Sequence, residues 1–104
     1  MKQEQLNKII EKHQHYLNED IDGWESMRAD LSDKNLSGLN LKNANLREVD
    51  LRNADLNYTY LYKTDLSYAD LRHANLNGAF FREANLLGTK IDYPIACPET
   101  GSFI

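Results

Sequence analysis

An apolar residue recurs at every fifth position along most of this chain, without a slip in register. The thirteen positions are Leu31, Leu36, Leu41, Leu46, Leu51, Leu56, Leu61, Leu66, Leu71, Leu76, Phe81, Leu86 and Ile91. A period of five matches neither the α-helix, with about 3.6 residues per turn, nor the β-strand, whose side chains alternate every second residue. Self-similarity at a fixed period instead predicts a solenoid, in which each repeat packs on its neighbours around one continuous core.

Each apolar centre stands in a five-residue unit of regular composition. Two positions before the centre, most units carry a small or compact residue, and only Lys34 and Leu39 depart from this pattern. Asp or Asn immediately precedes most centres, and both residue types tolerate turn conformations. The other positions of each unit are free to face water. A chain with 41% hydrophobic residues can therefore still bury a continuous core.

The segments NANLREVDLRNADL and TDLSYADLRHANL resemble pentapeptide-repeat proteins, whose consensus is A(D/N)LXX. The resemblance extends over residues 29–93. It implies a right-handed quadrilateral β-helix with four pentapeptides in each coil, in which the central and the small residues point inward. It also implies a bacterial or phage origin. We therefore predict an all-β solenoid, a right-handed quadrilateral β-helix of about three coils, with an N-terminal α-helical cap.

The chain divides into three predicted segments: a capping helix and turn at 1–28, the β-helix at 29–93 and a C-terminal tail at 94–104. A solenoid has an unpaired edge at each end, and that edge needs a cover. We expect a helix within residues 3–21, ending near Asp22-Gly23. Its apolar side follows helical spacing and consists of Leu6, Ile9, Ile10, His13, Leu17 and Ile21. An amphipathic membrane helix is the alternative, but the polar face carries mixed rather than basic charge.

Charge and cysteine content exclude several classes of protein. The chain has 12 Lys and Arg residues against 16 Asp and Glu residues, so it has no basic excess with which to hold a nucleic-acid backbone. The single cysteine, Cys97, cannot form an internal disulfide or a zinc site of several thiolates. No apolar run reaches the roughly 20 residues of a membrane span, and the N-terminus lacks a signal-peptide core. We expect a cytoplasmic protein that binds neither nucleic acid directly nor a membrane.

The residues that could carry chemistry lack the partners that catalysis requires. Asp50 and Asp70 fall on one face, but carboxylates recur at this position throughout the repeat and indicate solvated ladder residues rather than an acid–base pair. His13 and His15 point in different directions on a helix, which makes a metal pair improbable. His73 has no nucleophile beside it in register. We therefore predict no enzyme activity and no catalytic, cofactor or metal site.

Aromatic residues are the one departure from the repeat that suggests a function. Tyr60 and Phe80 replace the usual Asp or Asn and lie twenty residues apart, which stacks them on one wall above Asn40. The candidate interaction face consists of Tyr58, Tyr60, Tyr62, Tyr68 and Phe80, with Tyr58 and Tyr68 on the walls on either side. Outward tyrosines are enriched at binding surfaces. Intramolecular stacking along the wall is an equally weighted alternative.

The C-terminal end carries more apolar residues than a solvated tail would need. The candidate contacts for a dimer or a folded-back cap are Ile91, Tyr93, Ile95, Phe103 and Ile104. A second copy joined end to end across a twofold axis is the simplest partner by symmetry, and the family resemblance favours such a homodimer. The segment CPETGSFI also resembles the start of a further domain in longer pentapeptide-repeat proteins, so a missing C-terminal domain is the other interpretation.

Two functions are compatible with this organisation. The favoured one is a non-enzymatic structural or protein-interaction module whose partner the sequence does not identify. The alternative, implied by the family resemblance, is a DNA mimic that binds DNA gyrase or another topoisomerase and protects it from quinolones. A DNA mimic needs sustained negative charge along its length. Between Leu31 and Tyr93 the chain has eight cations and eight carboxylates, so its net charge of −4 comes from residues outside this range, which weighs against mimicry.

Overall fold

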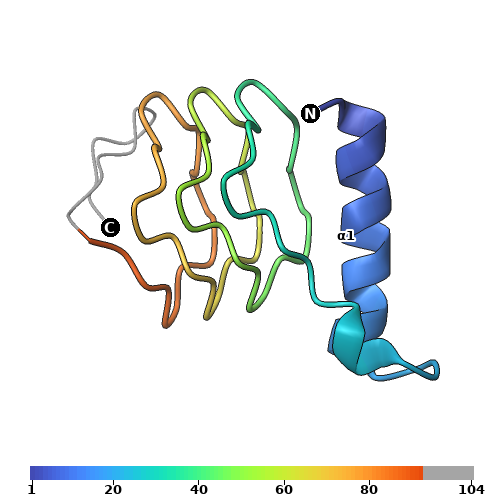
Figure 1. Cartoon of the computed structure of the whole chain (residues 1–104). Coiled ribbons are helices and arrows are strands. Elements are labelled where there is room, and N and C mark those ends of the chain that lie inside the picture. Colours follow the sequence, from blue (N-terminus) through green and yellow to red (C-terminus); the bar gives the residue numbers. More distant parts are fainter. Residues whose placement is uncertain (93–104) are drawn as a thin grey trace.

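The computed structural model describes residues 1–92, which form one helix followed by a stack of coils. Helix α1 spans Gln3–Asn18, and a short 3-10 helix, η1, spans Trp24–Ser26. The chain then winds away from α1 along a single axis, so that residues near 90 lie at the opposite end of the stack (Figure 1). Neither helix combines the length and the apolar character that a membrane span requires.

Successive coils pair through residues twenty positions apart. Parallel bridges join Asp30 to Asp50, Asp50 to Asp70, and Asp70 to Lys90, and the other three walls repeat this spacing. Four five-residue units therefore complete each coil, as predicted. The described repeat contains isolated bridges rather than extended strands. The reason is that a turn in every unit leaves too few consecutive residues in extended conformation for a longer ladder.

A tight turn follows each apolar centre. The carbonyl of Leu36, for example, accepts a hydrogen bond from the Leu39 N–H at 3.1 Å. The second residue after the centre has positive φ throughout, including non-glycine residues such as Asn53 at 60°. Just before the centre, the Asn35 Oδ1 accepts from the Ser37 N–H at 3.0 Å, and Asp or Asn side chains repeat this contact in most other units. This local bond explains why the repeat prefers Asp or Asn at that position.

The core is a column of buried leucines that runs along the axis. The centres from Leu31 to Leu76 are at most 4% exposed, and small residues such as Ala54 and Ala69 fill the corners between them. Two buried threonines occupy corner positions and add polar contacts. The Oγ1 of Thr59 donates to the Leu36 carbonyl of the preceding coil at 2.8 Å. The Oγ1 of Thr64 donates to the Leu41 carbonyl of that coil at 2.6 Å. Threonine therefore ties adjacent coils together from inside the core.

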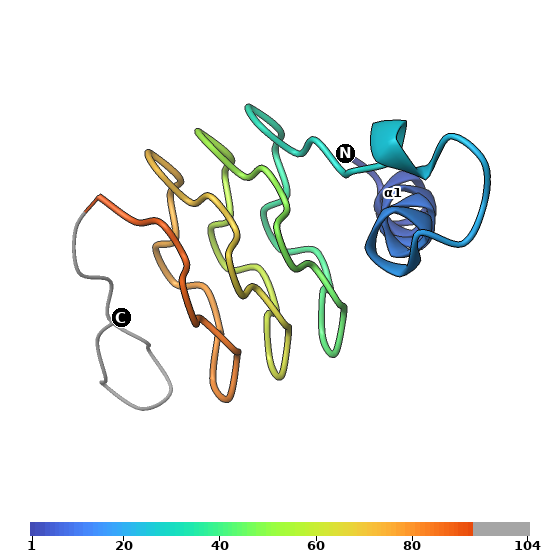
Figure 2. The same cartoon turned by 90° about the horizontal axis from the view of Figure 1, so that it is seen from below.

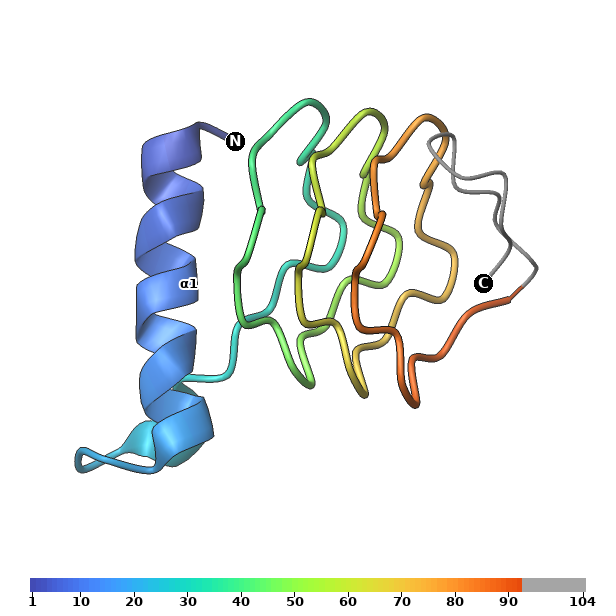
Figure 3. The same ribbon diagram turned by 180° about the vertical axis from the view of Figure 1, so that it is seen from behind.

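Helix α1 lies across the face of the first coil (Figures 1 and 3), and the view from below shows it beside that coil nearly end-on (Figure 2). It ends at Asn18 rather than near residue 21, because Glu19 adopts a left-handed conformation with φ of 53°. Ile21 therefore lies outside the helix and is 42% exposed, whereas Leu6 and His13 are fully buried. The apolar side of the helix is therefore shorter at its C-terminal end than predicted, because it does not include Ile21.

Candidate functional site

The side chains of α1 occupy hydrogen-bonding positions that a preceding coil would otherwise fill. Between inner coils, the carbonyl just before each centre accepts a bond from the neighbouring coil, as Asp50 does from the Leu31 N–H. In the first coil, the equivalent carbonyls of Asn40 and Asn45 accept from Gln3 Nε2 at 2.8 Å and from Gln14 Nε2 at 3.0 Å. Amide side chains of the helix therefore pair the edge that a solenoid leaves open.

His13 makes the most buried of these contacts. Its Nδ1 accepts from the Ala29 N–H at 2.9 Å, and its Nε2 donates to the Arg47 carbonyl at 2.8 Å. This arrangement requires the neutral ring, and burial lowers the pKa of His13 below its usual value. Sequence reasoning placed His13 on the apolar side of the helix but did not foresee this role. The signal was a histidine at a core position of an otherwise apolar pattern.

Tyr60 and Phe80 form the centre of the predicted aromatic surface. Their rings stack with centroids 5.2 Å apart and an interplanar angle of 14°, and their backbones are bridged. Tyr60 remains 41% exposed. We use the name aromatic wall for the wall built on Leu41, Leu61 and Phe81. Its outward side chains include Asn40, Lys42, Tyr60, Tyr62, Lys63, Phe80 and Arg82.

Cations accompany the rings of the aromatic wall. The Lys42 ammonium lies over the Tyr60 ring, 5.2 Å from its centroid, and the Lys63 ammonium lies 5.4 Å from that of Tyr62. Within residues 1–92, neither lysine has a carboxylate within 4.0 Å. The units of this wall contain three cations and one carboxylate, Glu83, which gives a net charge of +2. The other three walls, counted over residues 29–88 in the same way, have net charges of −2, 0 and −1.

Tyr58 and Tyr68 make a different kind of contact. They stand ten residues apart, which is half a coil, so they lie on opposite sides of the solenoid. A Cβ added at Gly78 would come within 2.5 Å of the Tyr58 ring, and one added at Gly88 within 2.5 Å of the Tyr68 ring. Each tyrosine therefore lies against a glycine of the next coil. Of the five predicted residues, Tyr60, Tyr62 and Phe80 share one wall, and Tyr58 and Tyr68 do not share a wall with each other.

Two carboxylates of the wall built on Leu31, Leu51 and Leu71 are paired with arginines. Asp50 accepts two bonds from Arg52, at 3.0 and 2.7 Å, and Asp70 accepts two from Arg72, at 2.9 and 2.7 Å. The arginine hydrogen bonds lower the pKa of Asp70 to about 2 and lower that of Asp50 as well. Both carboxylates are therefore ionised at neutral pH. A general acid would need a raised pKa, so this geometry does not suit one.

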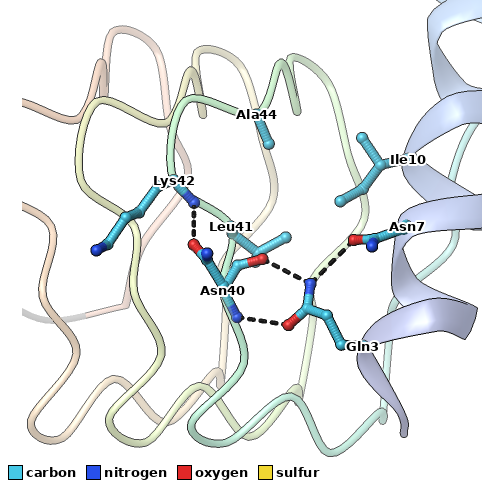
Figure 4. A pocket seen from close by; sticks show the side chains of 7 residues that line it. All are labelled: Gln3, Asn7, Ile10, Asn40, Leu41, Lys42 and Ala44. Carbon is cyan, nitrogen blue, oxygen red and sulfur yellow. Dashed lines mark hydrogen bonds between the residues drawn. The ribbon is translucent and has the colours of Figure 1, made fainter.

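A cleft opens between α1 and the first coil, next to the aromatic wall. It has a volume of about 350 Å³. Its apolar part comes from Ile10 of the helix and from Leu41 and Ala44 of the coil, and its polar part consists of Gln3, Asn7, Asn40 and Lys42. In Figure 4, Gln3 bridges the helix and the coil, while the Lys42 side chain runs away from α1. Its ammonium reaches Tyr60 of the second coil, so Lys42 joins the cleft to the aromatic wall.

Two further predictions concern metal ligands and the C-terminal contacts. Within residues 1–92, no group of three or more His, Cys, Asp or Glu side chains is placed to hold a metal ion. Ile91 is half-buried beside the last described coil. The other candidate contacts, Tyr93, Ile95, Phe103 and Ile104, lie outside the described residues, as does Cys97. The homodimer therefore stays a prediction.

Comparison with known proteins decides the family. The model of the pentapeptide repeats matches residues 29–67 and 64–93, with eight copies of the repeat. This chain belongs to the pentapeptide repeat family. Its solved members fold as right-handed β-helices, which agrees with the twenty-residue coils described above. A search of curated proteins found no significant match.

Two solved pentapeptide repeat proteins from cyanobacteria share this fold. Rfr23 from Cyanothece 51142 is 36% identical with a TM-score of 0.60, over 61% of this chain and 43% of that one. HetL from Nostoc sp. strain PCC 7120, involved in heterocyst differentiation regulation, is 29% identical with a TM-score of 0.59, over 74% of this chain and 33% of that one. This pentapeptide repeat protein therefore matches less than half the length of either relative.

The plasmid-mediated fluoroquinolone resistance protein QnrB1 is also similar, at 23% identity over 61% of this chain and 38% of that one. The TM-score is 0.21, so this match carries no argument about function.

Proposed function

We propose that this pentapeptide repeat protein is a non-enzymatic structural and protein-interaction module, and that the aromatic wall is its contact surface. The observation that carries the proposal is the coincidence, on one wall, of a stacked aromatic pair with the net positive charge. Lys42 and Lys63 have ring contacts but no ion pair within the described residues. Tyrosine and aromatic anchors surrounded by polar groups are typical of protein interfaces. Members of this family typically serve as structural or interaction modules, which supports the same function.

In this proposal α1 is the N-terminal cap of the solenoid. Three observations support it: the helix lies across the first coil, its amide side chains bond the edge carbonyls, and His13 is buried against that edge. The cap blocks the edge pairing through which solenoids would otherwise associate. At this end of the solenoid, association with other proteins is thereby directed to the walls.

The alternative of a gyrase-binding DNA mimic has less support. On the wall with the most carboxylates, Asp50 and Asp70 are largely buried and paired with Arg52 and Arg72. The wall charges differ in sign around the coil, whereas a mimic of duplex DNA would present negative charge continuously. Inhibition of gyrase supercoiling by the purified protein would support the alternative, and its absence would count against it.

The interaction surface can be tested by restoring the family consensus on the wall. In a Tyr60→Asp and Phe80→Asn double variant, the new side chains can accept from the N–H two residues later, as Asp65 does from Ser67 at 3.0 Å. The double variant should therefore fold. We expect the wild-type protein to retain a partner in affinity capture from the native host and the double variant to lose it.

The matched control is Tyr68→Asn, which removes an exposed tyrosine from the neighbouring wall, built on Leu46, Leu66 and Leu86. Asn is also suited to the positive φ at that position. We expect the control to retain the partner. Equal recovery with the wild-type protein and the double variant would refute the aromatic wall as the contact surface.

A further inference from the structure

The side-chain polar atoms of the cleft beside α1 that lack a hydrogen bond within residues 1–92 are all donors. The Gln3 amide is fully used, because Oε1 accepts from the Asn40 N–H while Nε2 donates to the Asn40 carbonyl and to Asn7 Oδ1. The Asn40 Oδ1 in turn accepts from the Lys42 N–H at 2.9 Å. Within residues 1–92, the side-chain atoms left over are Asn7 Nδ2, Asn40 Nδ2 and Lys42 Nζ. Donors without a competing acceptor favour an anionic group.

The same cleft offers an apolar surface next to these donors. Ile10 and Ala44 are half-buried and pack against the core, and Leu41 lies beneath them. A ligand for this site therefore needs an aliphatic side chain and a negative charge close together. Farther along the aromatic wall, apolar rings and cations again lie close together. Tyr60 and Phe80 supply the stacked rings, and Lys63 lies beside Tyr62.

We propose that the cleft and the aromatic wall together bind an extended acidic segment of a partner protein. An aliphatic side chain of that segment packs against Ile10 and Ala44, which cover the buried Leu41. Its carboxylates face Lys42 and the cations farther along the wall. This inference rests on the proposed function and adds the chemistry of the partner to it.

The dimensions of an extended chain suit this surface. Alternate residues of an extended segment face the same side and lie about 6.8 Å apart, so the first, third and fifth residues span about 14 Å. Neighbouring coils are separated by about 4.8 Å, which makes the path from the first coil to the third about 10 Å. A five-residue segment therefore reaches from the cleft across the Tyr60–Phe80 pair.

A single-stranded nucleic acid is the competing ligand for a surface with aromatic rings and cations. Such ligands bind by stacking bases on open ring faces. Here the faces of Tyr60 are covered, because Phe80 stacks on the ring and Lys42 lies over it. An extended peptide needs only the ring edges and the lysine ammonium groups, so the observed packing favours the peptide.

Binding can be measured with the full-length protein and defined probes. The first probe is a fluorescein-labelled Leu-Ser-Glu-Ser-Glu peptide, whose leucine and glutamates fall on one side of the extended chain. The second replaces both glutamates with lysine, and the third is a labelled ten-nucleotide oligo(dT). Fluorescence anisotropy gives the affinity, and amide chemical shifts in NMR spectra locate the site. We expect only the acidic peptide to bind, with shifts at Lys42, Ala44 and Tyr60.

Two variants test the donors, and one serves as a control. Lys42→Gln should weaken the acidic peptide about tenfold, the loss expected for one charge-assisted hydrogen bond. Asn7→Asp keeps the oxygen that accepts from Gln3 but replaces the free donor with a charge, so it should also weaken binding. Lys34→Gln makes the same charge change outside the aromatic wall and should leave the affinity unchanged.

Each other outcome overturns the inference. It fails if the lysine peptide binds as well as the acidic one, if oligo(dT) binds in preference, or if no probe binds. It also fails if Lys34→Gln and Lys42→Gln weaken binding equally, since that would reveal a general charge effect. If the Tyr60 and Phe80 double variant also loses the native partner, the proposed interaction module is still supported. Any of the results above would then refute only the proposal that the partner contributes an acidic segment.

Discussion

The buried His13 links the stability of the helix–solenoid contact to pH. Its Nδ1 accepts from the Ala29 N–H and can do so only while unprotonated. Burial lowers its pKa below 6.5 in the folded state, whereas the unfolded chain titrates near 6.5. The unfolded state therefore takes up the proton first as the pH falls. The stabilisation is complete above about pH 6.5 and is lost as the pH drops from there toward the folded-state pKa.

The size of the effect follows from proton linkage. Below the unfolded-state pKa, stability falls by about 1.4 kcal/mol for each pH unit until the folded state also binds the proton. Between pH 7.5 and 5.5 the loss from His13 has an upper limit of about 1.4 kcal/mol, which applies when the folded state stays unprotonated throughout. The variant His13→Gln is the matched control, because glutamine can accept and donate as Gln3 does but does not titrate. The variant His13→Leu should lose about 1–3 kcal/mol for each buried group left unpaired.

Urea unfolding at pH 7.5, 6.5 and 5.5 measures these differences. Trp24 is the single tryptophan and packs near Tyr16 of α1, with ring centroids 6.0 Å apart, so its fluorescence reports on this end of the molecule. Circular dichroism follows the whole chain and shows whether the helix end unfolds separately. The reasoning would be refuted if the wild-type protein and His13→Gln lost the same stability between pH 7.5 and 5.5.

Three further predictions concern the walls and the core. Thr59→Val should cost about 1 kcal/mol in urea unfolding, because it removes the hydroxyl bond to the preceding coil, while Thr59→Ser should keep that bond. Gly78→Ala should lower the free energy of unfolding by about 1–2 kcal/mol, because φ is +70° and the new Cβ would meet the Tyr58 ring. A double-mutant cycle with Tyr58→Ala should show a coupling free energy between the two sites. Asp70 has a pKa lowered from 3.8 to about 2, so its ion pair with Arg72 stabilises the protein above pH 3.8. This stabilisation is lost as the pH falls toward 2. Asp70→Asn should lack this loss of stability in acid unfolding.

The architecture could be predicted from the sequence because the interactions of the repeat act within one unit or between adjacent coils. Each centre such as Leu56 needs only its own unit to turn and the unit twenty residues away to pair with. The register, together with the four units per coil that the family resemblance implies, therefore predicts the neighbours. The Tyr60–Phe80 stack follows from that register. The extended strands implied by an all-β assignment were not observed in the described residues, because the turn in each unit interrupts them.

The contacts at the helix could not be derived in the same way. Nothing in the spacing of residues 3–21 says which backbone groups of the first coil they meet, since the helix and the coil have different periods. That Gln3 reaches Asn40 and that His13 joins Ala29 to Arg47 depends on how α1 is placed on the coil. The cleft that contains Lys42 arises from the same placement.

The sequence by itself thus determined the five-residue repeat and the solenoid, and its resemblance to a known family implied the coil of twenty residues and the side chains that share a wall. These properties depend on steric and hydrogen-bonding rules that act within a unit and between adjacent coils. Only the tertiary structure decided where α1 lies, that Tyr58 and Tyr68 lie against glycines, and that unpaired donors meet an apolar cleft beside the aromatic wall. Those features come from the packing of segments without a common repeat, and packing between such segments depends on the shape of both surfaces.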